Sequence, residues 1–348
     1  MQPPIMIEDT TNYPVKNVLV HRVMVKEDMI RLFKDSDIFI YNVDVRFIGD
    51  DGNEEAGVGI GVFRDALASF WSQFFNSLSI GAQEKVPAIR HDFQKAEWEA
   101  IGRILVYGYV REGYFPLPLS RGFLASCLFG EEAISQEYLL ASFRLYISED
   151  EREALDKCLS EEWVSDDEDV LDFLSNYQCF CNPQKENILQ IVCELAHKEL
   201  IQKPRYIVHC WAPIVRALLM YSDFTTLNGV ESVYDAKRPT AKKVVKLIVA
   251  QPSSAAERQC LDYLKKYIRS LQGVSLSLFL KFVTGSDVMS CKTIDVSFTN
   301  LDGAARRPII HTCGPSVELP STYQSYNELS EEFSELLQQK DSWKFNIV

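Results

Sequence analysis

The sequence lacks a net positive charge. Its 36 Lys and Arg residues stand against 49 Asp and Glu residues, which gives a formal net charge of −13. A general nucleic-acid binder needs a basic surface, because its affinity comes largely from releasing the counterions of phosphates. We therefore expect no nucleic-acid partner. The acidity fits docking to a basic protein surface, and it fits plain solubility equally well.

A long uninterrupted apolar segment is also missing. The most apolar long run covers residues 206–221, and it contains His209, Pro213 and Arg216. A helix that crosses a bilayer needs about 20 predominantly apolar residues. This run is shorter and more polar, so it predicts a buried helix, and we expect no membrane partner.

The sequence shows no secretion signal at its start and no paired set of cysteines. The first residues, Met1-Gln2-Pro3-Pro4, lack a basic segment followed by an apolar one. The nine cysteines are odd in number and scattered along the chain. Such usage is typical of reduced thiols, so we expect a cytoplasmic or nuclear protein.

The apolar content is sufficient for large cores. Hydrophobic residues make up 47% of the 348 residues, which is enough for two or three domains. Apolar spacing predicts helices over 63–78, 95–110, 121–129, 149–159, 186–201 and 206–221, and strands over 38–41 and 43–48. We read the acidic run 161–169 as a solvated loop. The first two-thirds of the chain is thus predicted to be mostly helical.

A polar, proline-ended stretch at residues 234–239 interrupts this pattern and predicts a linker. Beyond it, spacing predicts helices over 256–271, 276–283 and 326–338, and strands over 293–298 and 308–312. These elements indicate a small α+β unit of about 110 residues. The sequence therefore predicts an α+β fold of two lobes joined by a short hinge.

A glycine-rich segment, Gly57-Val58-Gly59-Ile60-Gly61, precedes the first long helix. It does not fit a phosphate loop, because no Lys-Ser/Thr pair follows, and its spacing is not that of a dinucleotide fingerprint. The acidic residues Glu54 and Glu55 would also repel phosphate. We interpret the segment as a tight structural turn.

Cys179, Cys181, Cys193 and His197 have the residue types of a zinc site. The last two lie four residues apart on a predicted helix, so they would point to one face. The long gap before Cys193 weakens this interpretation. Buried thiols and a surface histidine are the alternative, and we expect neither a metal nor a cofactor.

Cys313 lies between an apolar, strand-like approach and a Gly-Pro turn, which predicts a thiol at the tip of a loop. A Cys–His protease pair is not indicated. His311 would lie beside Cys313 on the same face of a strand, and no distant histidine is compelling. Exchange between a thiol and a thioester needs access and alignment more than a strong base. The placement of Cys313 favours that chemistry.

The residues around this cysteine form a recognisable set. The chain reads Arg307-Pro308-Ile309-Ile310-His311-Thr312-Cys313, then Glu318-Leu319-Pro320, then 323–329. This set resembles the catalytic loop and last helix of HECT-type E3 ubiquitin-protein ligases. Segments 43–57, 61–65, 93–108 and 282–286 are similar to further family motifs, and they follow in the family's order. The resemblance covers nearly the whole chain.

The resemblance implies a bilobal fold with a catalytic cysteine in the smaller lobe. Residues 1–234 would form a mostly helical N-lobe, with an E2-docking subdomain at about 137–203. Residues 235–239 would form the hinge, and 240–348 a small α/β C-lobe. Cys313 would accept ubiquitin from a charged E2 enzyme as a thioester and pass it to a lysine of a protein substrate. His311, Thr312 and Phe345 match supporting positions of the family.

The chain departs from the family pattern in two places. Gly314 follows the cysteine where family members usually carry an aromatic residue. The docking region at 137–203 is shorter than usual. These departures leave an alternative open, in which the chain is a catalytically degenerate HECT-like scaffold that binds E2 or ubiquitin without transfer.

Overall fold

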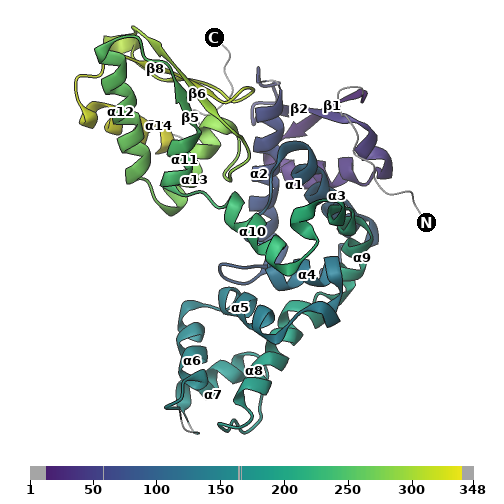
Figure 1. Cartoon of the computed structure of the whole chain (residues 1–348). Helices are drawn as coiled ribbons and strands as arrows, with labels where there is room; N and C mark the ends of the chain where they lie inside the picture. The colour runs from purple at the N-terminus through teal and green to yellow at the C-terminus, as the bar shows by residue number, and fades with distance from the viewer. Residues whose placement is uncertain (1–12, 58, 164, 166, 339–348) are drawn as a thin grey trace. The chain divides into compact units, whose positions relative to one another are not determined.

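The chain has an α+β fold that is mostly helical, with small sheets (Figure 1). A computed structural model describes residues 13–338 apart from residues 58, 164 and 166. Phe345 lies outside the described residues, so its predicted supporting role stays a prediction. Within the described part of the chain, no helix is long and apolar enough to cross a membrane.

The described residues divide into two compact units. Of the described residues, the first unit draws on 13–72, 107–116 and 234–338, and the second on 73–106 and 117–233. The predicted domain bounds differ from these and stay a prediction. Three helices are shared between the two ranges: α2 (Ile60–Ser77), α3 (Lys95–Glu112) and α10 (Leu227–Lys237).

The N-terminal part of the first unit is built on a parallel strand pair. β1 (Val15–His21) pairs with β2 (Asn42–Ile48), from Val15 opposite Asn42 to His21 opposite Ile48. The connection holds helix α1 (Val25–Phe33) between the 3-10 turns η2 (Arg22–Met24) and η3 (Ser36–Ile40). The aromatic ring of Tyr107 packs edge-on against Phe33 and Phe63, and its hydroxyl accepts a hydrogen bond from the Val43 amide at 3.0 Å.

The C-terminal part of the first unit contains a four-stranded sheet in the order β5-β6-β8-β7. Its strands are β5 (Ile248–Ala250), β6 (Ile294–Thr299), β7 (Ile309–His311) and β8 (Ser316–Pro320). β5, β6 and β8 run parallel, and β7 is antiparallel to β8. Around the sheet lie α11 (Ala241–Leu247), α12 (Ala255–Ser270), α13 (Gly273–Thr284) and α14 (Tyr326–Gln338) (Figure 1).

These C-terminal elements share a hydrophobic core that runs from Val244 to Leu337. The side chains of Leu264, Phe279 and Phe333 are fully buried in it. The start of α12 is set by a capping box, in which Ser254 and Glu257 satisfy each other's backbone amides. The short 3-10 turn η8 (Gly303–Ala305) lies between β6 and β7.

The second unit is almost entirely helical. Its elements besides the shared helices are the strand pair β3 (Ser79–Ile80) and β4 (Val86–Pro87), the helices α4 (Arg121–Phe129), α5 (Gln136–Tyr146), α6 (Glu149–Leu159), α7 (Glu168–Asn176), α8 (Ile188–His197) and α9 (Arg205–Val215), and the short turns η4 (Glu131–Ala133), η5 (Lys198–Gln202), η6 (Arg216–Met220) and η7 (Ser222–Phe224). η5 is a π-helical turn and the other three are 3-10 turns. α5 packs on α8, and α6 packs on α7.

Several sequence expectations differ from the structure, two of them in the first unit. Residues 38–41 were expected to form a strand, but η3 is a 3-10 turn, because the Asp35 side chain accepts a hydrogen bond from the Asp37 amide and so starts a turn. Of the predicted hinge 235–239, residues 235–237 continue α10. The non-helical link before α11 consists of residues 238–240.

Candidate functional site

Cys313 occupies the turn of the β7–β8 hairpin. His311 pairs with Ser316 at the end of the hairpin, so the residues between them form the turn, and Cys313 is exposed there. Strand β8 anchors the hairpin to the core, because its Val317 and Leu319 are fully buried there. The buried side chains on one face of β8 therefore fix the position of the hairpin. The predicted exposure of the Cys313 thiol at a loop tip is confirmed.

The turn packs directly on the glycine-rich segment at the start of α2. A Cβ atom added to Gly59 would lie 3.2 Å from the Cys313 sulfur, and one added to Gly61 would lie 2.5 Å from the carbonyl oxygen of Thr312. Real Cβ atoms essentially never approach within 3.0 Å of another atom, so the 2.5 Å contact with Thr312 requires that Gly61 have no side chain. Gly59 also has a φ of +94°, which favours glycine. The predicted structural turn is thus a surface on which the cysteine loop rests.

A third glycine completes this packing. Gly285 ends α13 in the left-handed conformation, with a φ of +78°. A side chain on it would collide with the carbonyl oxygen of Gly61. The Gly61 backbone therefore lies against both Gly285 and Thr312, and Gly59 lies against the side chain of Cys313.

The two residues before the cysteine are held in different ways. His311 is exposed, and its Nε2 lies 2.8 Å from Glu318 Oε1 on the neighbouring strand. Thr312 is buried, with 6% of its surface exposed, against the Gly61 backbone. Both residues thus fix the shape of the turn that carries Cys313.

The environment of the Cys313 thiol favours its neutral form. Partial burial raises its pKa above the usual value, and the charge of Asp44 adds to this, while a hydrogen bond from backbone N–H opposes it. A hydrolase that works through a resting thiolate would need the opposite shift. These surroundings suit a thiol that reacts once a bound partner has placed its reactive carbon next to the sulfur of Cys313.

A buried ion cluster lies on the same face of α2, beyond the glycine turn. The guanidinium of Arg22 makes two parallel hydrogen bonds of 2.8 Å to the Glu55 carboxylate and also bonds Asp65. Lys281, on α13, lies 3.1 Å from Asp65 and donates to the Ser69 hydroxyl at 3.2 Å. The cluster therefore ties η2, the Glu55 loop and α2 to α13.

The charges of this cluster decide the state of its central carboxylate. Burial alone would raise the pKa of Asp65, but the nearby Lys281 and Arg22 outweigh it and hold the pKa below its usual range. A second buried bond lies nearby, where the Tyr114 hydroxyl donates to Asp287 at 2.9 Å. Burial raises the pKa of Asp287, because its charge is poorly compensated there.

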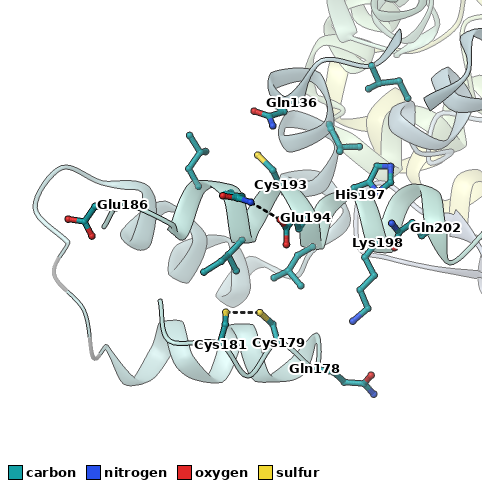
Figure 2. A pocket seen from close by; sticks show the side chains of 16 residues that line it. Gln136, Gln178, Cys179, Cys181, Glu186, Cys193, Glu194, His197, Lys198 and Gln202 are labelled. Carbon is teal, nitrogen blue, oxygen red and sulfur yellow. Dashed lines mark hydrogen bonds between the residues drawn. The ribbon is translucent and has the colours of Figure 1, made fainter. Parts of the chain in front are cut away.

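The proposed zinc ligands lie along one pocket of the second unit, between α5, α8 and the segment that follows α7 (Figure 2). The sulfur atoms of Cys179 and Cys181 are 3.1 Å apart, whereas Cys193 is buried and points away from them in Figure 2. His197 lies 3.7 Å from Glu131 instead. Among the described residues, no three His, Cys, Asp or Glu side chains form a group that could hold a metal ion.

Sequence reasoning missed several residues that shape the site. The glycine segment was predicted as a turn, but its contact with residues 312–313 was not foreseen, and neither was the cluster around Asp65. The repeated glycines at a strand-to-helix junction were the available signal, since such glycines often mark a close approach of another backbone. No protein-family model matches the chain, and no curated protein matches it.

Proposed function

We propose that the chain is a HECT-type ubiquitin-protein transferase in which Cys313 carries ubiquitin as a thioester. The observation that carries this proposal is the exposed thiol on a rigid hairpin, set in the motif described above. Its neighbours His311 and Thr312 shape the turn and take no proton from the thiol in this proposal. Cys313 would be the single nucleophile.

The chemistry consists of two acyl transfers. In the first, the Cys313 thiolate attacks the thioester carbon of ubiquitin bound to E2; a sulfur–carbon bond forms, and the E2 thiolate leaves and takes up a proton. In the second, a substrate lysine amine attacks the new thioester and loses a proton, and Cys313 leaves as thiolate. The first step exchanges one thioester for another and is close to thermoneutral, so alignment contributes most of the acceleration.

The neutral resting state of Cys313 supports this assignment over a hydrolase. A thiol with a raised pKa is a poor nucleophile until it is deprotonated, which protects it from unrelated electrophiles. Once deprotonated, a thiolate of higher pKa is also the stronger nucleophile. Transfer would therefore occur when a bound partner orients the thioester against the turn.

The C-terminal part of the first unit fits the role of a C-lobe. Residues 244–337 have a hydrophobic core of their own, and they are reached through the short non-helical link at 238–240. The cysteine must face E2 in one step and substrate in the next, so this part of the chain needs two orientations. In this proposal, the change of orientation breaks the ion pair between Lys281 and Asp65.

The region predicted to dock E2 carries exposed apolar side chains. Phe180, between α7 and α8, is 83% exposed, and Leu189, on α8, is 52% exposed. Exposed large apolar residues gathered on a few helices often mark a binding surface. They support E2 docking at residues 137–203.

The proposal is tested by incubating the chain with E1, E2, ubiquitin and ATP. We expect a ubiquitin adduct that is cleaved by reducing agent, that is absent in Cys313→Ala, and that becomes resistant to reducing agent in Cys313→Ser, where an oxyester forms. Cys291→Ser is the matched control, because this cysteine lies in the same unit and is half-buried. An adduct that persists unchanged in Cys313→Ala would overturn the assignment.

The scaffold alternative keeps binding and loses transfer. The absence of an aromatic side chain at Gly314 and the short docking region at residues 137–203 favour it. It would be supported if charged E2 bound the chain measurably and no thioester formed on Cys313 at any pH between 7 and about 9, where an ordinary thiol ionises.

A further inference from the structure

The end of α7 places two cysteines on a defined backbone. The Cys179 amide donates to the Leu174 carbonyl at 3.0 Å, and the Gln178 amide donates to the Ser175 carbonyl at 2.8 Å. This pair of bonds is a Schellman motif, in which the residue after the C-cap adopts the left-handed conformation. Gln178 occupies that position with a φ of 58°. The motif fixes Cys179 and directs the chain toward Cys181.

The two thiols are adjacent and accessible. The sulfur atoms of Cys179 and Cys181 lie 3.1 Å apart (Figure 2), Cys181 is exposed and Cys179 is half-buried. A disulfide bond has a sulfur–sulfur distance of about 2.05 Å, so the pair needs to close by only about 1 Å. Both sulfurs border the open pocket along α8, through which a small molecule can reach them.

The observations exclude a role for the pair as half of a larger metal site within the described residues. In the part of the chain that the structure describes, no third His, Cys, Asp or Glu joins the two sulfurs in a group that could hold a metal ion. Cys193, the nearest candidate in the sequence, is buried on α8. What the two sulfurs have in common is access to the pocket and to each other.

We propose that Cys179 and Cys181 form a reversible dithiol–disulfide site that reacts with small soluble disulfides of the glutathione class. The proposal is independent of the function proposed for Cys313. The oxidant would reach the two sulfurs through the pocket beside α8, and the conformation of residues 179–181 would change on oxidation.

The reaction proceeds in two balanced steps. The thiolate of one cysteine attacks a sulfur of glutathione disulfide; a mixed disulfide forms, and one glutathione thiolate leaves. The second cysteine then attacks the protein sulfur of the mixed disulfide, and the second glutathione leaves. Overall, two thiols lose two electrons and two protons, and one glutathione disulfide becomes two glutathione molecules. Excess dithiol reductant reverses the sequence.

The second step is fast because both sulfurs belong to one short segment. Intramolecular attack by a neighbouring group has a high effective concentration, so the mixed disulfide is short-lived. At rest the Cys181 thiol is protonated, since burial, followed by the hydrogen bond and charge of Cys179, raises the pKa of Cys181 to about 11. The dithiol therefore persists until it meets an oxidant.

A disulfide bond between Cys179 and Cys181 would alter the conformation of the exposed residue between them. Phe180 has 83% of its surface exposed, and its backbone would become part of a small covalent ring. The ring restricts the backbone torsions of this residue and so the direction in which its side chain is presented. Oxidation thus changes the surface next to the pocket without requiring any change in the core.

The test treats the full-length chain with glutathione disulfide, blocks free thiols with an alkylating reagent and locates each modification by mass spectrometry. In the wild type we expect Cys179 and Cys181 to escape alkylation as one cross-linked peptide with two hydrogens fewer. In Cys179→Ser and in Cys181→Ser, we expect the remaining cysteine of the pair to retain glutathione at a level at least about tenfold above the wild type. Cys193→Ser, which removes a buried thiol of the same pocket, should behave as the wild type.

A second probe checks the pair without oxidation. Phenylarsine oxide joins two neighbouring thiols with release of one water, so it should protect Cys179 and Cys181 from alkylation in the wild type and neither residue in the single serine variants. Far-ultraviolet circular dichroism confirms that each variant is folded. The proposal is overturned if the wild type accumulates glutathione on Cys179 or Cys181 to the same level as the single variants, or if the arsenical protects neither thiol.

Discussion

The ammonium group of Lys281 lies 3.1 Å from the carboxylate of Asp65, and this ion pair joins α13 to α2. Asp65 also bonds the guanidinium of Arg22, so one buried carboxylate compensates two cations. Removing the shared partner of a buried ion cluster is costly, because Lys281 loses a compensating charge and Arg22 keeps only Glu55. The stability of the first unit should therefore depend strongly on Asp65.

The first prediction concerns Asp65→Asn. This variant should lower the free energy of unfolding by about 3 kcal/mol, because Arg22 and Lys281 lose their common anion while staying largely buried. Urea unfolding followed by tryptophan fluorescence measures the loss. Glu54→Gln is the control, since its ion pair with Arg46 is well exposed and should not affect the midpoint. Equal effects of both substitutions would show that the cluster adds no stability.

The second prediction concerns the pH dependence of that loss. The folded state holds the pKa of Asp65 below its usual value, so the ionised carboxylate stabilises the fold. This contribution is fully present above the unfolded pKa of about 3.9, and it is lost as the pH falls through the lower folded pKa. The difference in unfolding free energy between wild type and Asp65→Asn should be constant from pH 5 to 7 and shrink below about pH 4. A difference that grew with acidity would contradict the assignment.

The local elements were predictable where a cap and an apolar face occur together. Helix α6 begins after Ser148 and carries Glu151 at the third position, a capping box that can be read from the sequence. Helix α7 was missed because its acidic start at residues 167–169 was read as a solvated loop. In the structure, the Asp167 side chain caps the helix by accepting a hydrogen bond from the Asp169 amide.

The candidate site was predictable only in part. The position of Cys313 on an exposed turn followed from local sequence, because a strand before it and a Gly-Pro pair after it define a loop. Its contact with Gly59 and Gly61 did not, since about 250 residues separate the two segments and nothing local encodes their meeting. Such close long-range contacts require glycines, but the sequence does not show which distant segment the glycines contact.

The third prediction concerns Gly61→Ala. Alanine favours the start of α2 by up to about 1 kcal/mol, but its Cβ would lie 2.5 Å from the backbone oxygen of Thr312. Overpacking costs about 1–3 kcal/mol, so the clash outweighs the helix propensity. We expect a net destabilisation of about 1–2 kcal/mol and faster alkylation of Cys313, because the turn is displaced.

The control for this substitution lies beside the cysteine itself. Gly314 has no neighbouring atom within 4 Å of an added Cβ and no positive φ, so Gly314→Ala should leave both stability and alkylation unchanged. Urea unfolding and the rate of reaction with iodoacetamide measure the two effects. If Gly61→Ala behaved like Gly314→Ala, the packing of the turn on the glycine segment would be wrong.

The fourth prediction concerns the charge of Asp44 and the reactivity of Cys313. Partial burial raises the thiol pKa first and the Asp44 charge adds to it, so Asp44→Asn should lower that pKa and raise the thiolate fraction at pH 7.5. We expect alkylation at Cys313 to accelerate by about twofold, the size of a screened interaction between partly exposed groups. Above the thiol pKa both thiols are fully ionised, so the acceleration should disappear. Asp37→Asn, an exposed charge in η3, serves as the matched variant and should have no effect.

The fifth prediction concerns the strained residue before the dithiol. Gln178 adopts a φ of 58°, where an L-residue other than glycine pays about 1–2 kcal/mol. Gln178→Gly removes this cost but gives the unfolded chain more freedom, which returns about 0.5–1 kcal/mol. The net result should be a stabilisation of about 0.5–1 kcal/mol, measured by urea unfolding, with the spacing of Cys179 and Cys181 unchanged. Gln184→Gly, outside a left-handed position, should stabilise nothing; a gain in that variant, or a loss in Gln178→Gly, would mean that the Schellman motif does not end α7.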